Sequence, residues 1–375
     1  GGKDENVFDI QQGVSIILAI KNPVGAGSPR PGRQDAAPTI KHAHLWGKRE
    51  EKYAALRDSS LDDIEWKELN PDKPFYFFMP QDIGLREEYE QGWKINDAMP
   101  VNSAGIVTAR DDLTIHWSEN ELLKTLKEFV SLTEENARSK FNLGVDVRDW
   151  KVAWAQEDIR STGIERKKVA PILYRPFDIR TTYYTGQTRG FICMPRAEVM
   201  KNMLAGENLA LATVRKAPPS SDCGYFMVSN HIISNGAIRS DNQSIDMLFP
   251  LYLYTTPEET AGTLFAQTET TRKPNLAPEF IRAVEERLKV TVTSEVTVTS
   301  GAASNQITPE DIFHYAYAVF HSPTYRTRYA EFLKIDFPRL PITSDKKLFA
   351  KLAAKGKELV ELHLLKSSQV DDFVT

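Results

Sequence analysis

Apolar positions recur along the chain in two spacings, and each spacing predicts a different kind of element. Leu122, Leu126 and Phe129 repeat at intervals of three or four residues, which is typical of the buried side of an α-helix. Ser118 and Glu121 precede them in the arrangement of a capping box, whose hydroxyl and carboxylate accept hydrogen bonds from free amides at a helix start. The pattern therefore predicts a helix that begins after Ser118.

Other helices are predicted from similar spacings and start signals. Thr308 followed by Pro309 combines an N-cap residue with proline at the first helical position. The predicted helices run from Ile40 to Leu56, from Pro195 to about Leu204, from Thr308 through Phe320, and from Ser344-Asp345 to about Leu365.

Short apolar runs without helical spacing predict strands. These runs are Val7 to Lys21, Ile64 to Leu69, Phe75 to Met79, Leu209 to Arg215, Tyr225 to Val228 and Phe249 to Tyr254. Val290 to Thr299 alternates Val and Thr, which predicts a hairpin edge or an ordered loop. The first run is apolar on both faces, as in the middle of an α/β sheet, yet it has no neighbouring sheet to join. Asn22 to Pro38 is a predicted loop. Because the chain also opens on two glycines without an initiator Met, we expect a piece of a longer protein.

Charge is distributed unevenly along the chain. Between Arg160 and Arg239 there are 12 Lys and Arg against 5 Asp and Glu, a net charge of +7. The whole chain carries −4, so the residues outside this basic block sum to −11. A local positive field in an acidic protein indicates a negatively charged partner, with nucleic acid as the first candidate.

Composition excludes several other classes of protein. With 41% hydrophobic and 26% charged residues, the chain resembles ordinary soluble proteins, and no apolar run is long enough to span a membrane. Cys193 and Cys223 form no CxxC pair, which fits a reducing, cytoplasmic location. We therefore expect no zinc site, no membrane partner and no signal peptide.

Several long blocks resemble the C-terminal region of large restriction–modification enzymes, the single-chain Type ISP proteins and the related Type IIG enzymes, which carry an N6-adenine DNA methyltransferase. The blocks are GIVTARD (Gly105 to Asp111), YRPFDIRTTYY, MPRAEVMKNML, FPLYLY and the run from His314 to Ile342 with Leu348 to Leu365. The first strands resemble the last strands of the methyltransferase sheet.

The resemblance implies a target recognition domain that binds double-stranded DNA, reads a short sequence and presents one adenine to the adjoining methyltransferase. It also implies a mixed α/β fold in three parts. Residues 1–70 would be the tail of the methyltransferase sheet and a connector, residues 71–250 a central basic α/β module, and residues 251–375 a mainly helical module that completes a DNA clamp.

The catalytic signatures of the family are missing from this chain. Neither Asn22-Pro23-Val24 nor Asn70-Pro71-Asp72 matches the Asn/Asp-Pro-Pro-aromatic motif, and no GxxxxGK[ST] motif occurs. We therefore expect no enzymatic activity and no cofactor in this chain. The parent enzyme would use S-adenosylmethionine, ATP and Mg²⁺.

Basic and amide side chains in these blocks are the candidate DNA contacts. They are Arg110, Arg175, Arg180, Gln187, Arg189, Arg196, Arg215, Lys216, Asn230, Asn235 and Arg239. Arginine can bind phosphate or fork onto guanine, and Asn or Gln can pair with adenine. Each also has a structural interpretation: Arg175 and Arg180 could bind Asp178, Arg110 could bind Asp111 or a helix, and the amides could stabilise loops.

Two other functions remain open at this stage. The chain could be a small methyltransferase or nuclease complete in itself, against which the missing motifs argue. It could instead be a scaffold that docks motor and methyltransferase domains without contacting DNA, which the acidic balance outside the basic block permits. Salt dependence separates DNA binding from docking, because phosphate contacts weaken steeply with salt.

Overall fold

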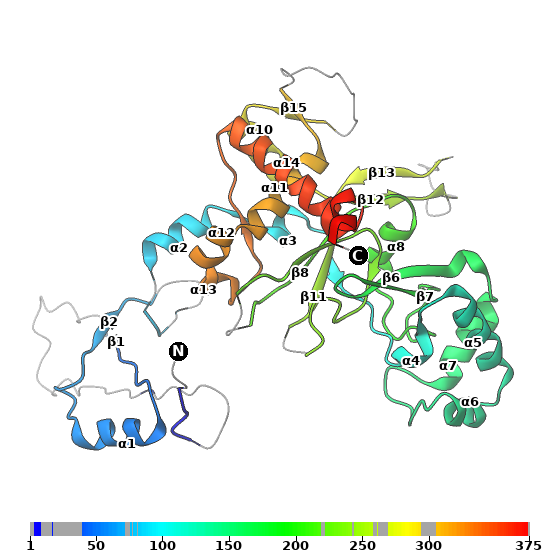
Figure 1. Cartoon of the computed structure of the whole chain (residues 1–375), viewed down its shortest axis with the longest axis horizontal. Coiled ribbons are helices and arrows are strands. Elements are labelled where there is room, and N and C mark those ends of the chain that lie inside the picture. The colour runs from blue at the N-terminus through cyan, green and yellow to red at the C-terminus, as the bar shows by residue number, and fades with distance from the viewer. Residues whose placement is uncertain are drawn as a thin grey trace, which may run out of the picture. The chain divides into compact units, whose positions relative to one another are not determined.

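The computed structural model describes residues 4–8, 17, 40–71, 76, 78–80, 82–218, 222–241, 244–257, 261, 269–293 and 305–373. The chain divides into two compact units, Gly1–Gly84 and Leu85–Thr375. Both helices and small sheets are present (Figure 1), so the predicted mixed α/β fold is confirmed. The strands predicted over Val7 to Lys21 and the loop over Asn22 to Pro38 lie almost entirely outside the described residues. The boundaries at residues 70 and 250 stay predictions.

The first unit contains β1 (Ile40–His42), α1 (Arg49–Asp58) and β2 (Lys67–Leu69). β1 pairs antiparallel with β2, so the prediction that the helix starts at Ile40 is wrong. Gly47, with φ of +117°, interrupts the helical path, and the Glu51 carboxylate accepts from the N–H of Lys48 at 3.0 Å to start α1. Of the strand predicted over Phe75 to Met79, the described residues 76, 78 and 79 are not in a strand.

The second unit contains the remaining helices and strands, and α2 begins two residues before the first residue of this unit, Leu85. The helices are α2 (Ile83–Glu90), α3 (Ile95–Ala98), α4 (Asp111–Thr114), α5 (Glu119–Ser131), α6 (Glu134–Lys140), α7 (Val152–Thr162), η1 (Arg166–Lys168), α8 (Ala197–Leu204), α10 (Pro278–Leu288), α11 (Pro309–His321), α12 (Pro323–Arg328), α13 (Ala330–Leu333), α14 (Lys346–His363) and η2 (Ser368–Phe373). The strands are β3 (Trp93–Lys94), β4 (Ser103–Ala104), β5 (Ile115–His116), β6 (Val169–Arg175), β7 (Asp178–Tyr183), β8 (Ala210–Val214), β9 (Phe226–Ser229), β10 (Ile232–Ile233), β11 (Asp246–Pro250), β12 (Tyr252–Thr255), β13 (Thr271–Pro274), β14 (Thr291–Val292), β15 (Gln306–Ile307) and β16 (Arg339–Leu340).

A four-stranded antiparallel sheet in the order β4-β11-β8-β9 is buried on both faces. Successive side chains of a strand point to opposite faces, and the register keeps each set together. Leu211, Val228 and Phe249 join a hydrophobic cluster with the C-terminal helices, whereas Ala212, Met227 and Leu248 join a second cluster. One short sheet therefore connects two hydrophobic cores.

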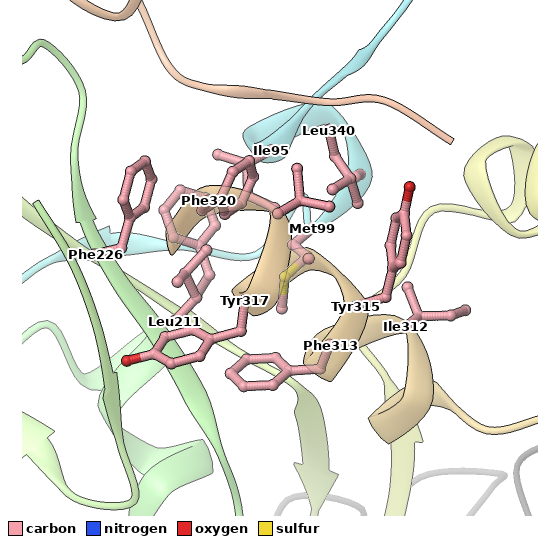
Figure 2. Packing of buried hydrophobic residues seen from close by; sticks show 14 of the residues in the cluster. Ile95, Met99, Leu211, Phe226, Ile312, Phe313, Tyr315, Tyr317, Phe320 and Leu340 are labelled. Carbon is pink, nitrogen blue, oxygen red and sulfur yellow. The ribbon is translucent and has the colours of Figure 1, made fainter. Parts of the chain in front are cut away.

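The first core forms where α11 packs on this sheet and on α14. Figure 2 shows Tyr317 and Phe320 of α11 directed toward Leu211 and Phe226. The rings of Phe226 and Phe320 stack with centroids 4.9 Å apart. A Cβ at Gly356 would lie 1.8 Å from the carbonyl oxygen of His314, so the close approach of α14 to α11 requires glycine there.

The second core lies between the sheet β10-β6-β7-β5 and the helices α5 and α7. β6 pairs antiparallel with β7 and parallel with β10. Large fully buried side chains fill this core: Phe129, Trp150, Tyr183 and Phe191. It positions the loops that follow β5, β7 and β10.

Most predicted elements of the second unit are present. Ser118, Thr308 and Asp345 are N-caps whose side chains accept backbone hydrogen bonds, and β8 and β9 occupy the predicted strands. α7 was not predicted, because the buried polar side chains of Gln156 and Asp158 interrupt its apolar spacing. Among the described residues, no helix is long and apolar enough to cross a membrane.

Candidate nucleic-acid interface

A buried carboxylate in α7 holds the loop after β7, which carries Gln187 and Arg189. The Asp158 side chain is fully buried, and its Oδ2 accepts from the N–H of Phe191 and the hydroxyl of Thr185, both at 2.8 Å. A Cβ at Gly190 would lie 2.2 Å from this oxygen, so only glycine permits the approach. Burial raises the pKa of Asp158. Both ends of the loop are thereby fixed.

A second buried carboxylate, Asp246 at the start of β11, holds the loop after β10. Its Oδ2 accepts from the N–H groups of Ile238 at 2.7 Å and Arg239 at 3.2 Å. Its backbone carbonyl accepts from the N–H of Gly105 at 3.0 Å. Burial raises the pKa of Asp246 as well. This loop carries Asn235 and Arg239 at a defined position beside β11.

The GIVTARD block connects these loops. Ile106 donates its N–H to Ile233 at 2.9 Å, and Asn235 donates its N–H to Ile106 at 2.7 Å. Val107 pairs with Met194, two residues before Arg196. A Cβ at Gly105 would lie 2.5 Å from the backbone of Ser234, so the block passes directly against the Asn235 loop. Backbone hydrogen bonds therefore join the GIVTARD block to the Asn235 loop and to Met194.

Arg110 stabilises a loop rather than projecting freely. Its guanidinium donates to the carbonyl oxygens of Ala109, Leu143 and Val145 at 2.6 to 2.9 Å. It also lies over the ring of Trp150, 4.8 Å from the centroid. Each of the three guanidinium nitrogens thus donates within the chain, which favours the structural interpretation of this arginine.

Arg175 and Arg180 belong to a ladder of stacked side chains at the β6–β7 turn. Arg180 lies between the rings of Trp117 and Tyr174, 4.0 and 4.4 Å from their centroids, and Arg175 lies 4.0 Å from the centroid of Tyr174. Arg180 also binds both carboxylate oxygens of Asp178. The ion pair expected from the sequence therefore exists, and Trp117, at 70% exposed, is the solvent-facing end of the ladder.

Three further arginines of the basic block have acidic partners within the chain. Arg189 binds Asp149 at 3.1 Å, Arg215 binds Asp336 at 2.9 Å, and Arg239 binds Asp241. Arg239 also donates to the hydroxyl of Tyr225 at 2.6 Å, and its side chain is 12% exposed. Internal pairing thus neutralises much of the positive charge counted along the sequence.

Arg196 has a different environment. It is the N-cap of α8 in the left-handed region, with φ of +54°, and its Nη2 lies 3.4 Å from Sδ of Met194. Its buried Nε has no hydrogen-bond partner among the described residues. The guanidinium therefore keeps an unsatisfied donor where α8 meets the GIVTARD block.

Four of the candidate side chains carry no hydrogen bond or ion pair within the described part of the chain: Gln187, Lys216, Asn230 and Asn235. Gln187, Lys216 and Asn235 are exposed and Asn230 is half-buried. Their polar groups are available to a partner, while the backbone around Gln187 and Asn235 is held by Asp158 and Asp246. DNA contact by any of the candidates stays a prediction.

The candidates do not form a single cluster. Asn235, Arg239 and Lys216 are grouped around the start of β11, since Val214 pairs with Asp246 and Ser244 donates to the Lys216 carbonyl. Gln187 and Arg189 belong to the loop held by Asp158. Sequence reasoning missed both buried carboxylates. An Asp within an otherwise apolar run such as IDMLFP is the signal that could have identified Asp246.

Comparison with known proteins identifies a related family. The family model described as the Type ISP C-terminal specificity domain matches residues 97–374. Comparison with the curated proteins gives no match. In the described residues, no group of three or more His, Cys, Asp or Glu side chains could hold a metal ion.

Two solved structures share the fold. One is the cryoEM structure of the DrdV–DNA complex, with 22% identity and a TM-score of 0.52 over 85% of this chain and 30% of that chain. The other is the ATP-dependent Type ISP restriction–modification enzyme LlaBIII bound to DNA, with 15% identity and a TM-score of 0.54 over 84% of this chain and 19% of that chain. This chain therefore spans less than a third of either protein.

Proposed function

The chain belongs to the family of Type ISP C-terminal specificity domains, and from this premise we propose that it recognises a short sequence in double-stranded DNA for a restriction–modification enzyme. The family match over residues 97–374 is the observation that carries the proposal. Unpaired amide side chains on two anchored loops support it, because a reading side chain needs a free donor or acceptor and a fixed backbone.

The finer parts of the proposal concern the longer enzyme. The domain would present one adenine to an adjoining methyltransferase, and the adenine must leave the base stack to be methylated. S-adenosylmethionine, ATP and Mg²⁺ would be bound elsewhere in the parent protein. This chain would contribute binding and not catalysis.

Binding to a pool of random duplexes across a salt series, with sequencing of the bound fraction, tests the proposal. Enrichment of a short motif together with a steep loss of affinity with salt is the expected result. Salt-sensitive binding without enrichment would mean that the domain binds DNA without reading its sequence. No binding at low salt would instead support the docking scaffold that contacts no DNA.

Replacement of Asn235 or Gln187 by Ala tests base reading directly. We expect preference at one base pair to relax, at a cost of about 1–3 kcal/mol in discrimination, with little change in nonspecific affinity. Asn136→Ala is the matched control, since Asn136 is an exposed amide of α6 and belongs to neither loop. Equal weakening on every sequence would show that these amides do not read bases.

A further inference from the structure

The solvent-facing side of α5 carries a row of polar residues outside the candidates above. Asn120, Lys124, Lys127 and Ser131 follow one another at intervals of three or four residues, opposite the buried Leu122, Leu126 and Phe129. Arg166 of η1 borders the same surface. Together with Leu123 and Glu128, these residues line an open hollow of about 560 Å³, which we call the α5 hollow.

The α5 hollow has a net positive charge that internal ion pairs do not remove. Glu128 is paired with Lys140, and Glu119 is paired with Arg166 at 2.7 Å, so each of these two carboxylates already has a cation partner. Lys124 and Lys127 are exposed, and neither ammonium group has a partner among the described residues. They differ in this respect from Arg180, Arg189 and Arg215.

The shape of the α5 hollow fits a polymer better than a small anion. From Asn120 to Ser131 the helix rises about 16 Å, at about 1.5 Å per residue, which corresponds to several base-pair steps along one DNA strand at about 3.4 Å each. A small anion would need an enclosed site with converging donors, whereas this surface is open to solvent. Lysine binds phosphate as a mobile point charge without demanding one geometry.

We propose that the α5 hollow binds the sugar–phosphate backbone of DNA, with Lys124 and Lys127 neutralising phosphates and the Asn120 amide donating a hydrogen bond at one end. The proposal rests on the DNA recognition proposed above and adds a second, sequence-independent contact surface to it. Such contacts set affinity and register without reading bases. The α5 helix packs on the same core that supports the Gln187 loop, so the two surfaces belong to one rigid framework.

Charge reversal at both lysines in the full chain tests the proposal. We expect the double variant Lys124→Glu/Lys127→Glu to weaken binding to a duplex of mixed sequence by about tenfold or more. The slope of log affinity against log salt should become shallower by about 2, because each neutralised phosphate contributes about 0.9. Sequence preference among the bound duplexes should be unchanged. Fluorescence anisotropy between about 50 and 200 mM salt measures the affinity and the salt slope, and sequencing of the fraction bound from a random pool measures the sequence preference.

Lys347→Glu/Lys351→Glu is the matched control, with the same change in net charge at two exposed lysines of α14. Equal weakening by the control would overturn the proposal, because the two lysines of the α5 hollow would then contribute no more than two other exposed lysines. An unchanged salt slope in the α5 variant would overturn it too. The neutral variant Lys124→Gln/Lys127→Gln, checked by thermal melting, separates lost contact from misfolding. If the unmodified chain binds no DNA, the proposed function itself fails.

Discussion

Individual residues of the interface differ in whether their polar groups are used within the chain. Asp158 and Asp246 each direct one carboxylate oxygen to backbone or hydroxyl donors of a loop, while Oδ1 of each has no hydrogen-bond partner among the described residues. A buried carboxylate with an unsatisfied oxygen costs stability. We interpret both as positioning residues that fix the backbone of the Gln187 and Asn235 loops.

Substitution of Asp158 separates its hydrogen bonds from its charge. Asn keeps an acceptor for Phe191 and Thr185 and removes the buried charge, so Asp158→Asn should remain within about 1 kcal/mol of the original stability at pH 7. Asp158→Ala should lose about 2–3 kcal/mol, because it leaves buried donors unpaired. Urea unfolding measures both. Equal losses in the two variants would mean that the negative charge itself is required.

The pKa of Asp158 also gives a pH dependence. Because burial raises it in the folded state, the folded protein binds the proton more readily than the unfolded chain does. The contribution of Asp158 to stability therefore decreases as pH rises through the folded pKa, and Asp158→Asn should remove that decrease.

At the scale of elements, the C-terminal end of β8 carries two adjacent cations with different environments. Arg215 binds Asp336, which also binds Lys94 at 2.9 Å, whereas Lys216 has no ion-pair partner in the described residues. Arg215 therefore forms an ion pair within the chain, whereas the ammonium group of Lys216 faces solvent.

Separate substitutions of Lys216 and Arg215 should distinguish the two roles. Lys216→Glu should weaken binding to all DNA sequences and make the salt slope shallower by about 1, with little change in stability. Arg215→Ala should reduce stability by less than about 1 kcal/mol, because Arg215 is largely exposed and Asp336 keeps Lys94 as a partner. Anisotropy and urea unfolding of both variants test this. Unchanged DNA affinity in Lys216→Glu would show that this strand end faces away from DNA.

Two partly buried histidines, His321 and His363, lie where α11 packs on α14, and their burial disfavours protonation. Burial, as the larger cause, and repulsion from a protonated His363, as a smaller cause, lower the pKa of His321 to about 4. Burial also lowers the pKa of His363. The hydroxyl of Tyr317 lies 2.5 Å from Nδ1 of His363, and the two histidine rings are 5.1 Å apart. Neutral imidazoles therefore fit this contact, whereas imidazolium ions do not.

Acid should accordingly loosen this helix pair. A histidine whose pKa is lowered by folding makes the protein more stable above its unfolded pKa and less stable as pH falls from about 6.5 toward 4. We expect a loss of about 1–2 kcal/mol between pH 7 and pH 5, reduced in His321→Gln. Urea midpoints at several pH values measure it. Identical pH profiles for the two proteins would contradict the assignment to His321.

At the scale of the second unit, the sheet β4-β11-β8-β9 makes two hydrophobic cores depend on each other. Phe249 belongs to the core with the C-terminal helices, and the adjacent Leu248 belongs to the core with α5 and α7. A change on either face shifts the backbone that both cores share. We therefore expect the two cores to unfold together.

Phe249→Ala tests this coupling. Truncation of a fully buried phenylalanine should cost about 3–5 kcal/mol. Hydrogen exchange should accelerate in α5 as well as in α11, even though α5 belongs to the other core. Faster exchange confined to α11 would show that the two cores open independently.

Several features follow from local sequence alone. Helix starts at Ser118, Thr308 and Asp345 depend on side chains within three residues of the amides that they cap, and β8 and β9 depend on short apolar runs. These interactions are local, so pattern and spacing predict them. The helix predicted from Ile40 was wrong because pairing of β1 with β2 brings together residues almost thirty positions apart.

The candidate interface shows where prediction from sequence stops. The sequence by itself determined the family blocks, the mixed α/β class and the set of basic and amide side chains near them. Only the tertiary structure decided which of those side chains are free, since Arg215 meets Asp336 across 121 positions and Arg189 meets Asp149 across 40. Ion pairing depends on distance in space, and the fold brings an arginine to an acid that no local pattern reveals. For the same reason Lys124 and Lys127, outside the basic block, emerged as free cations only once their neighbours were known.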